Sequence, residues 1–194
     1  MSKENSSASD MAKGLIQVER SAIEGNFAKG FYTVLCFDKD GEIKWEEHMP
    51  NLVMNVGLVD MNQQYFTGSG WTATWYLGLI NGPGASNTYS ATATMSSHTG
   101  WTENTGYSNA TRPACTFGSP TSANPSVISN SASAASFNIT ATSTIGGAFL
   151  TSNNTKGGTT GTLFSAASFQ SPGDRSVVNG DILTVTYTFQ LTAT

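Results

Sequence analysis

Apolar and polar residues alternate at the two-residue period of β-strands along most of the chain beyond residue 30. The clearest run is ILTVTYTFQL at 182–191, in which threonine alternates with large apolar residues, so it predicts a long strand with one buried and one wet face. Comparable runs bounded by turn residues predict further strands at 71–80, 134–140, 145–151 and 161–169. This order of strands favours a mainly β fold, an antiparallel β-sandwich of jelly-roll-like type.

A hairpin is predicted where the β pattern starts. FYTVLCF at 31–37 is β-branched and aromatic, and EIKWE at 42–46 places Ile43 and Trp45 between charges. Asp40 and Gly41 between the runs are predicted to supply the positive-φ positions of a tight turn. The second strand is therefore expected to have one wet face.

One short helix interrupts the strands near 52–66. Four apolar residues there share one face of a helix by their spacing, namely Met54, Leu58, Met61 and Tyr65. Asn51 is available as an N-terminal cap. We expect this face to pack on the sandwich.

Charge and composition divide the chain into an arm and a domain. Residues 1–50 hold nine of the 13 acids and six of the nine bases, which leaves four acids and three bases for the other 144 residues. We predict a polar arm at 1–29 and a β-sandwich domain at 30–194, with long loops in 81–133. The only apolar cluster of the arm is Leu15, Ile16 and Val18, which is predicted to contact a partner.

Composition limits the possible partners. Only 11% of residues are charged, against about 25% in an average soluble protein, and such a surface suits fixed contacts in an assembly. The net charge of −4 provides no basic patch for nucleic acid. No apolar run reaches the ~18 residues of a membrane span. No apolar stretch follows the polar N-terminus as in a signal peptide, so synthesis in a cytosol is expected.

Cofactor and metal chemistry are not indicated. Cys36 and Cys115 lie far apart, without a Cys-x-x-Cys spacing, which favours two reduced core thiols and leaves a disulfide open. His48 and His98 are 50 positions apart and belong to no zinc motif. We expect no cofactor and no metal site.

No catalytic residues stand out. His98 with Glu103 could form part of a Ser-His-acid arrangement, but no G-x-S-x-G motif accompanies them. The β-rich part contains four acids that a glycosidase could use, which are Asp60, Glu103, Asp174 and Asp181. Nothing singles out a pair among them, so we do not expect an enzyme.

Aromatic residues gather in the middle of the chain. They are Trp71, Trp75, Tyr76, Trp101 and Tyr107. Such rings form a sugar-stacking platform when exposed, or a core or interface when buried. Core or interface is favoured, and Trp71, Trp101 and Tyr107 remain candidate partner-binding residues.

Several segments together resemble a group of structural proteins of tailed bacteriophages and prophages. The segments are 38–45 (DKDGEIKW), 51–53 (NLV), 75–79 (WYLGL), 97–103 (SHTGWTE) with Tyr107 and Arg112-Pro113, 145–150 (IGGAFL) and 178–187 (VNGDILTVTY). The likeness spans about residues 30–190. It implies a component of the virion without enzyme activity, and it transfers no active site.

Two places in a virion are open to such a protein. A compact sandwich with a polar arm and no coiled-coil shaft favours a decoration or cement protein on the capsid surface, made in the cytoplasm of the host bacterium. Its partner would be the major capsid protein, and a homo-oligomer, dimer or trimer, is expected. The alternative is a tail fibre or adhesin module that binds a host glycan or receptor, for which exposed Trp71, Trp101 and Tyr107 in one groove would be diagnostic.

Overall fold

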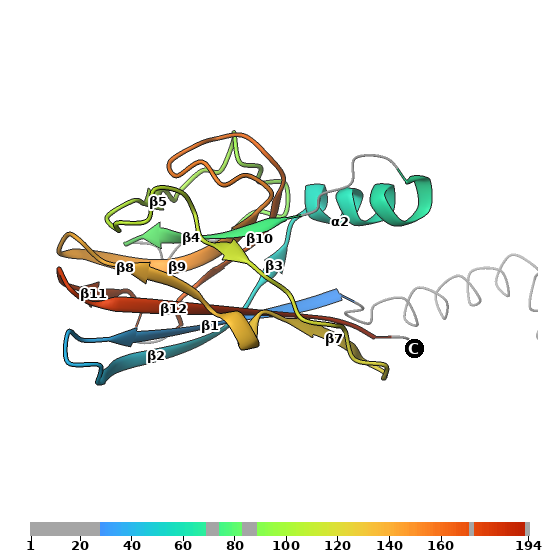
Figure 1. The fold of residues 1–194 in the computed structure, drawn as a ribbon. Coiled ribbons are helices and arrows are strands. Elements are labelled where there is room, and N and C mark those ends of the chain that lie inside the picture. The colour runs from blue at the N-terminus through green and yellow to red at the C-terminus, as the bar shows by residue number, and fades with distance from the viewer. Residues whose placement is uncertain (1–27, 69–73, 83–88, 171–172, 193–194) are drawn as a thin grey trace, which may run out of the picture.

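Two antiparallel β-sheets face each other in the computed structural model, which describes residues 28–68, 74–82, 89–170 and 173–192 (Figure 1). The first sheet has the order β2 (Ile43–Pro50), β1 (Ala28–Phe37), β12 (Ile182–Leu191), β7 (Ser126–Ser129), and β8 (Ala135–Asn138) also pairs with β12. The second has the order β3 (Leu52–Val53), β10 (Leu163–Ser168), β9 (Ser143–Thr151), β4 (Trp75–Asn81), β5 (Glu103–Asn104), with β11 (Arg175–Val177) on β9 and β6 (Ala114–Cys115) on β4. The predicted mainly β fold with antiparallel sheets is confirmed.

The first sheet is built around the long pair β1 and β12. Their register is continuous from Ala28 opposite Leu191 to Phe37 opposite Ile182. Large side chains of both strands point inward, and Tyr32 lies opposite Tyr187 with their ring centroids 4.8 Å apart. The threonines of β12 lie on its other, half-buried face, as the alternation predicts.

The hairpin from β1 to β2 forms at the predicted place, with a different turn. Gly41 has φ 87°, whereas Asp40 keeps a negative φ, so the prediction of two positive-φ residues is wrong for Asp40. The Asp38 carboxylate instead accepts the backbone N–H groups of Asp40 at 2.8 Å and Glu42 at 3.0 Å. These bonds stabilise the charged form and lower the pKa of Asp38.

The second sheet is covered on both faces. Strands β9 and β10 are buried along nearly their whole length. One face packs against the first sheet in the central core, and the other carries a second cluster that includes Met54, Met95, Trp101 and Phe149. Burial on both faces explains the continuous apolar runs of these strands.

The predicted helix is present, with other boundaries and another face. Helix α2 (Asn55–Asn62) continues as one π-helical turn, η1 (Gln63–Thr67), while residues 52 and 53 form β3. The residue before α2 is Met54 and no side chain caps the helix, so the predicted cap at Asn51 is wrong. Met54 is buried, but Leu58 and Tyr65 of the predicted apolar face are exposed.

The connections in 81–133 are mainly irregular where the structure describes them, with the short strands β5, β6 and β7 among them. Ala28 and Lys29, assigned to the arm by composition, belong to β1. Leu15, Ile16, Val18 and Trp71 lie outside the described residues. No helix among the described residues is long and apolar enough to cross a membrane.

Candidate interaction surface

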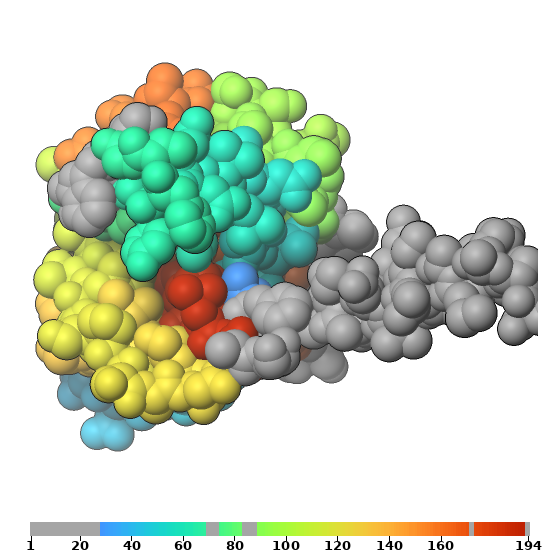
Figure 2. Space-filling model, turned by 90° about the vertical axis from the view of Figure 1, so that its right-hand side faces the viewer, coloured from blue at the N-terminus to red at the C-terminus, as the bar shows by residue number. Residues whose placement is uncertain are grey.

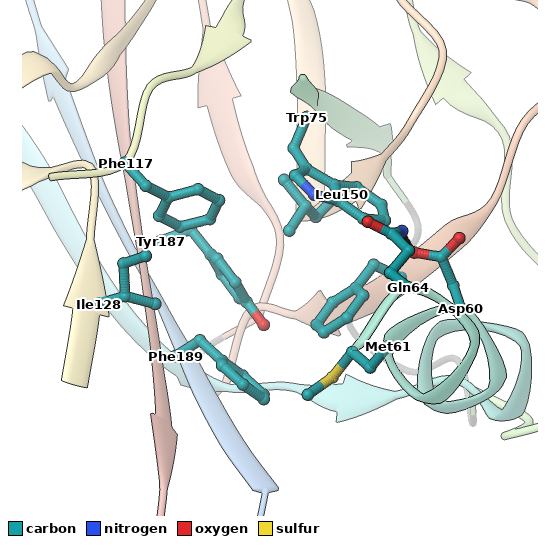
Figure 3. A pocket seen from close by; sticks show the side chains of 10 residues that line it. Asp60, Met61, Gln64, Trp75, Phe117, Ile128, Leu150, Tyr187 and Phe189 are labelled. Carbon is teal, nitrogen blue, oxygen red and sulfur yellow. Dashed lines mark hydrogen bonds between the residues drawn. The ribbon is translucent and has the colours of Figure 1, made fainter. Parts of the chain in front are cut away.

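An apolar groove of about 210 Å³ opens at the end of the sandwich that carries α2 (Figure 3). Both sheets and the helix contribute to it. Its lining residues are Asp60, Met61, Gln64, Trp75, Phe117, Ile128, Leu150, Phe164, Tyr187 and Phe189. Six of these are aromatic or branched aliphatic side chains from the strands. We name this space the α2 groove.

Edge-to-face ring contacts fix the walls of the α2 groove. The Phe164 ring lies 5.2 Å from Trp75 and 5.5 Å from Phe189, both nearly perpendicular, and Phe117 lies 6.2 Å from Tyr187. Asn51 donates a hydrogen bond to the Tyr187 hydroxyl at 2.9 Å. Burial raises the pKa of Tyr187 well above its ordinary value, so this phenol stays neutral.

Apart from the Tyr187 hydroxyl, the polar side chains that line the α2 groove in the described part of the chain are Asp60 and Gln64 at its rim. Gln64 donates a hydrogen bond to the Asp60 carboxylate one helical turn earlier. Among the described residues, the lining contains no histidine, cysteine, serine or lysine. Its chemistry therefore fits the binding of apolar side chains, with the rim able to meet a peptide backbone.

Large apolar side chains are exposed on the helix beside the groove. Their exposed fractions are 84% for Tyr65, 78% for Phe66, 54% for Val59 and 40% for Leu58. The rings of Tyr65 and Phe66 contact each other edge to face at 4.9 Å. We name these four residues the α2–η1 patch. Isolated exposed apolar residues are ordinary, but a contiguous group on one projecting helix is typical of a contact surface.

The start of β1 lies at the same end of the molecule. Figure 2 shows the ends of β12 (red) and β1 (blue) in a hollow between α2 (teal) and the segment of β7 (yellow). The groove residue Phe189 pairs with Gly30, two residues from Ala28, where the described chain begins. Residues 1–27 therefore attach next to the α2 groove.

Two of the predicted partner-binding aromatics are buried in separate places. Trp101 is 6% exposed and stacks on His98 with 3.9 Å between ring centroids, in the second cluster. Tyr107 is 2% exposed and packs against Phe137 in the central core. The two rings thus form no common groove. Of the aromatics noted from the sequence that the structure describes, Trp75 is the one that lines the α2 groove.

The acid Glu103 belongs to a buried ion pair. Arg112, 1% exposed, donates from Nε to Oε1 at 2.9 Å and from Nη2 to Oε2 at 2.7 Å. Arg112 also donates to the carbonyls of Asn153 and Gly158, both at 2.8 Å, and its guanidinium lies 5.2 Å from the centre of the Phe149 ring. The pair ties the loop around Arg112 to the loop between β9 and β10.

Other candidate residues have structural contacts. His98 Nδ1 bonds to the Trp101 carbonyl at 3.1 Å, whereas both carboxylate oxygens of Glu103 accept hydrogen bonds from Arg112, so the two residues serve separate structural contacts. Asp181 is buried and pairs with Lys44 at 2.5 Å. Asp60 lies on α2, and Asp174 lies just before β11. Within the described ranges, no three His, Cys, Asp or Glu side chains are placed to hold a metal ion.

Both cysteines are free, buried thiols, as expected from their spacing. Burial raises the pKa of Cys36 and of Cys115 to about 12. For Cys36 the nearby Asp181 carboxylate adds to the shift. A neutral buried thiol is a poor nucleophile, so these residues act as core side chains.

Sequence reasoning missed most of the groove and the patch. Phe117, Ile128 and Phe189 come from separate segments, and their spacing in the sequence does not predict that these segments meet at one groove. A signal did exist at Tyr65-Phe66, because consecutive helix residues are about 100° apart and Phe66 therefore lies beside the face that Met54, Leu58, Met61 and Tyr65 share. Followed by the turn residue Gly68, this pair could have been recognised as a surface feature.

Comparison with known proteins adds no relative. No protein-family model, curated protein or solved structure matches the chain. The resemblance to phage structural proteins gains no support from these comparisons. The function of the chain is therefore inferred from its own residues and their geometry.

Proposed function

We propose that the chain is a structural protein of a tailed-phage particle that binds the outside of the capsid as a decoration or cement protein. It would bridge subunits of the major capsid protein and stabilise their joints. The observation that carries the proposal of a binding role is the α2–η1 patch beside the arm. The phage assignment itself comes from the sequence resemblance.

The exposed aromatic side chains of the patch can supply the free energy of a specific contact. Full burial of one large apolar side chain contributes about 1.5–3 kcal/mol. Tyr65 and Phe66 are mostly exposed, so a partner that covers both would gain several kcal/mol from them. Aromatic anchors of this kind commonly dominate the energy of an interface.

The weak charge of the folded part supports a fixed contact more than a long-range electrostatic one. Among the described residues, five of the six Lys and Arg side chains already bind a carboxylate or a backbone carbonyl. They are Lys39, Lys44, Arg112, Arg175 and Lys156. Little positive charge is left to attract an acidic partner from a distance.

The tail-module alternative is less well supported. Its diagnostic arrangement is Trp71, Trp101 and Tyr107 exposed in one groove, and Trp101 and Tyr107 are instead buried in different clusters. No other observation among the described residues favours a glycan site over a protein contact. We therefore prefer the capsid surface.

Cryo-electron microscopy of the intact particle tests the location. We expect many copies over the head lattice, each with the α2 end toward the capsid and with dimers or trimers visible as such. A few copies at the tail tip would overturn the proposal and favour receptor binding. Absence from the particle would remove the virion assignment altogether.

Binding to isolated, undecorated heads tests the patch. The double substitution Tyr65→Ser, Phe66→Ser should weaken binding at least tenfold, since truncation of one aromatic anchor costs about 2 kcal/mol or more. The matched control is Ile43→Ser, because Ile43 is 59% exposed but lies in the hairpin at the opposite end. Equal binding of the two variants would show that the patch is not the contact.

A further inference from the structure

We propose that the α2 groove is the binding site for the chain's own N-terminal segment, and that Ile16 and Val18 are the side chains that enter it. The inference goes beyond the proposed function and needs no capsid. It rests on the chemistry of the groove, on where the described chain begins, and on the composition of residues 1–27.

The chemistry and volume of the groove are suited to aliphatic side chains. Its described wall residues are apolar apart from the Tyr187 hydroxyl, and Asp60 and Gln64 are the polar residues described at its rim. A dry protein cavity of about 150 Å³ holds one benzene ring. The 210 Å³ of the α2 groove therefore suit about two aliphatic side chains.

The N-terminal segment has one stretch that matches. LIQV at 15–18 is the densest apolar cluster of residues 1–27, in which Ser, Lys, Glu and Asn are otherwise common. In an extended segment, side chains two positions apart point to the same side. Ile16 and Val18 can therefore enter one groove together, with polar Gln17 on the other side.

The tether is long enough. Nine residues, 19–27, separate Val18 from Ala28. At about 3.3–3.6 Å per residue they span up to about 30 Å. The groove residue Phe189 lies opposite Gly30 in the β1–β12 register, so the required distance is a fraction of that span.

The N-terminal segment of the same chain is favoured over that of a second copy as the occupant of the α2 groove. A short connection within one chain gives an effective concentration in about the millimolar range, which a second copy matches only at comparable protein concentration. Binding at 15–18 would leave residues 1–14 projecting beside the α2–η1 patch. That places the polar tip where the proposed capsid contact would be made.

Crosslinking of the full-length protein tests the site. We would combine Ile16→Cys with Gln64→Cys at the groove rim and add a short bismaleimide. The native thiols do not compete, because Cys36 and Cys115 are buried. The matched control combines Ser7→Cys with Gln64→Cys, which tethers the same rim to the polar part of the segment.

We expect crosslinks within single chains at several times the yield of the Ser7 control. Equal yields would overturn the proposal. So would crosslinks that form only between chains, detected by mixing copies of different mass, because the occupant would then be a second copy.

Methyl NMR provides an independent readout. Ile16→Asp, Val18→Asp should shift the methyl signals of Met61, Ile128 and Leu150 in the groove, whereas Ser7→Asp, Ser9→Asp, with the same added charge, should not. Unchanged signals in both variants would also refute the proposal. Neither assay involves capsids, so a failure here is distinct from a failure of the Tyr65 and Phe66 experiment.

Discussion

Replacing Arg112 by methionine is expected to destabilise the fold strongly without touching the α2 groove. The guanidinium makes four hydrogen bonds, two to Glu103 and one each to the carbonyls of Asn153 and Gly158. Methionine can fill much of the space over Phe149 but donates no hydrogen bond. The substitution therefore isolates the polar part of the contact.

The size of the expected loss of stability follows from the buried Glu103 carboxylate, which remains without Arg112. The Glu103 side chain is only 7% exposed and would keep its bond from the Gly157 N–H at 2.7 Å while losing its positive partner. Breaking a buried ion pair from one side costs about 3–5 kcal/mol. Such a loss is a large part of the ~5–15 kcal/mol that holds a typical domain folded.

Urea unfolding followed by tryptophan fluorescence measures the effect. We expect Arg112→Met to lower the free energy of unfolding by about 3–5 kcal/mol, and Arg112→Met with Glu103→Leu to recover part of it, because the unpaired carboxylate is gone. The control is Lys39→Met, whose partner Asp40 is exposed, with an expected change under about 1 kcal/mol. A cooperative transition with a loss below about 1 kcal/mol for Arg112→Met would refute the reasoning.

Three further outcomes can be checked on the purified protein. Gly147→Ala should lower the melting temperature in calorimetry, because the added Cβ would lie 2.1 Å from the Ala167 carbonyl oxygen. Overpacking of this kind costs about 1–3 kcal/mol of stability, and an unchanged melting temperature would contradict the close approach. Cys36 and Cys115 should resist a thiol reagent at pH 8 until denaturant is added, and rapid reaction of the native protein would contradict their burial. Urea unfolding at several pH values should show a free energy of unfolding that is retained below pH 9 and falls above it. The reason is that the pKa of each thiol, about 12 in the folded protein, exceeds the unfolded value of 9.0. The expected slope is about 1.4 kcal/mol per pH unit for each thiol, and a constant free energy of unfolding up to pH 11 would contradict it.

The strands were predictable because a local pattern decides them. In β12, inward residues such as Val185 and Tyr187 lie between outward threonines, and the sandwich preserves that alternation. The neighbouring strand was less regular. Ile43 was expected to lie on the buried face of β2, but the β1–β2 register shifts between Cys36 and Phe37, and Ile43 is exposed. A bulge moves side chains to the other face of the sheet, and the two-residue alternation of the sequence does not predict where a bulge occurs.

The helix was predictable in kind but not in its contacts. A repeat at 54, 58, 61 and 65 fits a helix, yet only part of that face joins the sandwich. Met54 is buried and Met61 packs against the central core, whereas Leu58 and Tyr65 are exposed. Gly57 lies against the backbone of Phe164, where a Cβ would be 2.8 Å from the carbonyl oxygen, so the approach depends on glycine. Toward its C-terminal end the helix projects past the sheets, and Tyr65 is exposed there (Figure 1).

The groove could not be predicted, since it depends on which segments meet. Trp75 lies on β4, Ile128 on β7 and Phe189 on β12, and β4 belongs to a different sheet from the other two. Strand order decides that these three side chains share one space. The alternation in each segment indicates only that its apolar residue is inward, which core and groove positions have in common.

The two ends of the sandwich differ in a way that bears on how the protein binds. At the hairpin end, charges meet each other: Lys44 pairs with buried Asp181, and Arg175 with buried Glu47. At the α2 end, the described surface offers Tyr65, Phe66 and an apolar groove instead. Ion pairs that are already formed gain little from a new partner, whereas exposed apolar area gains whenever it is covered. The hairpin end also exposes Ile43, Val178 and Ile182, but these side chains are smaller and less exposed than Tyr65 and Phe66. The larger gain from covering apolar surface is therefore expected at the end where the N-terminal segment also attaches.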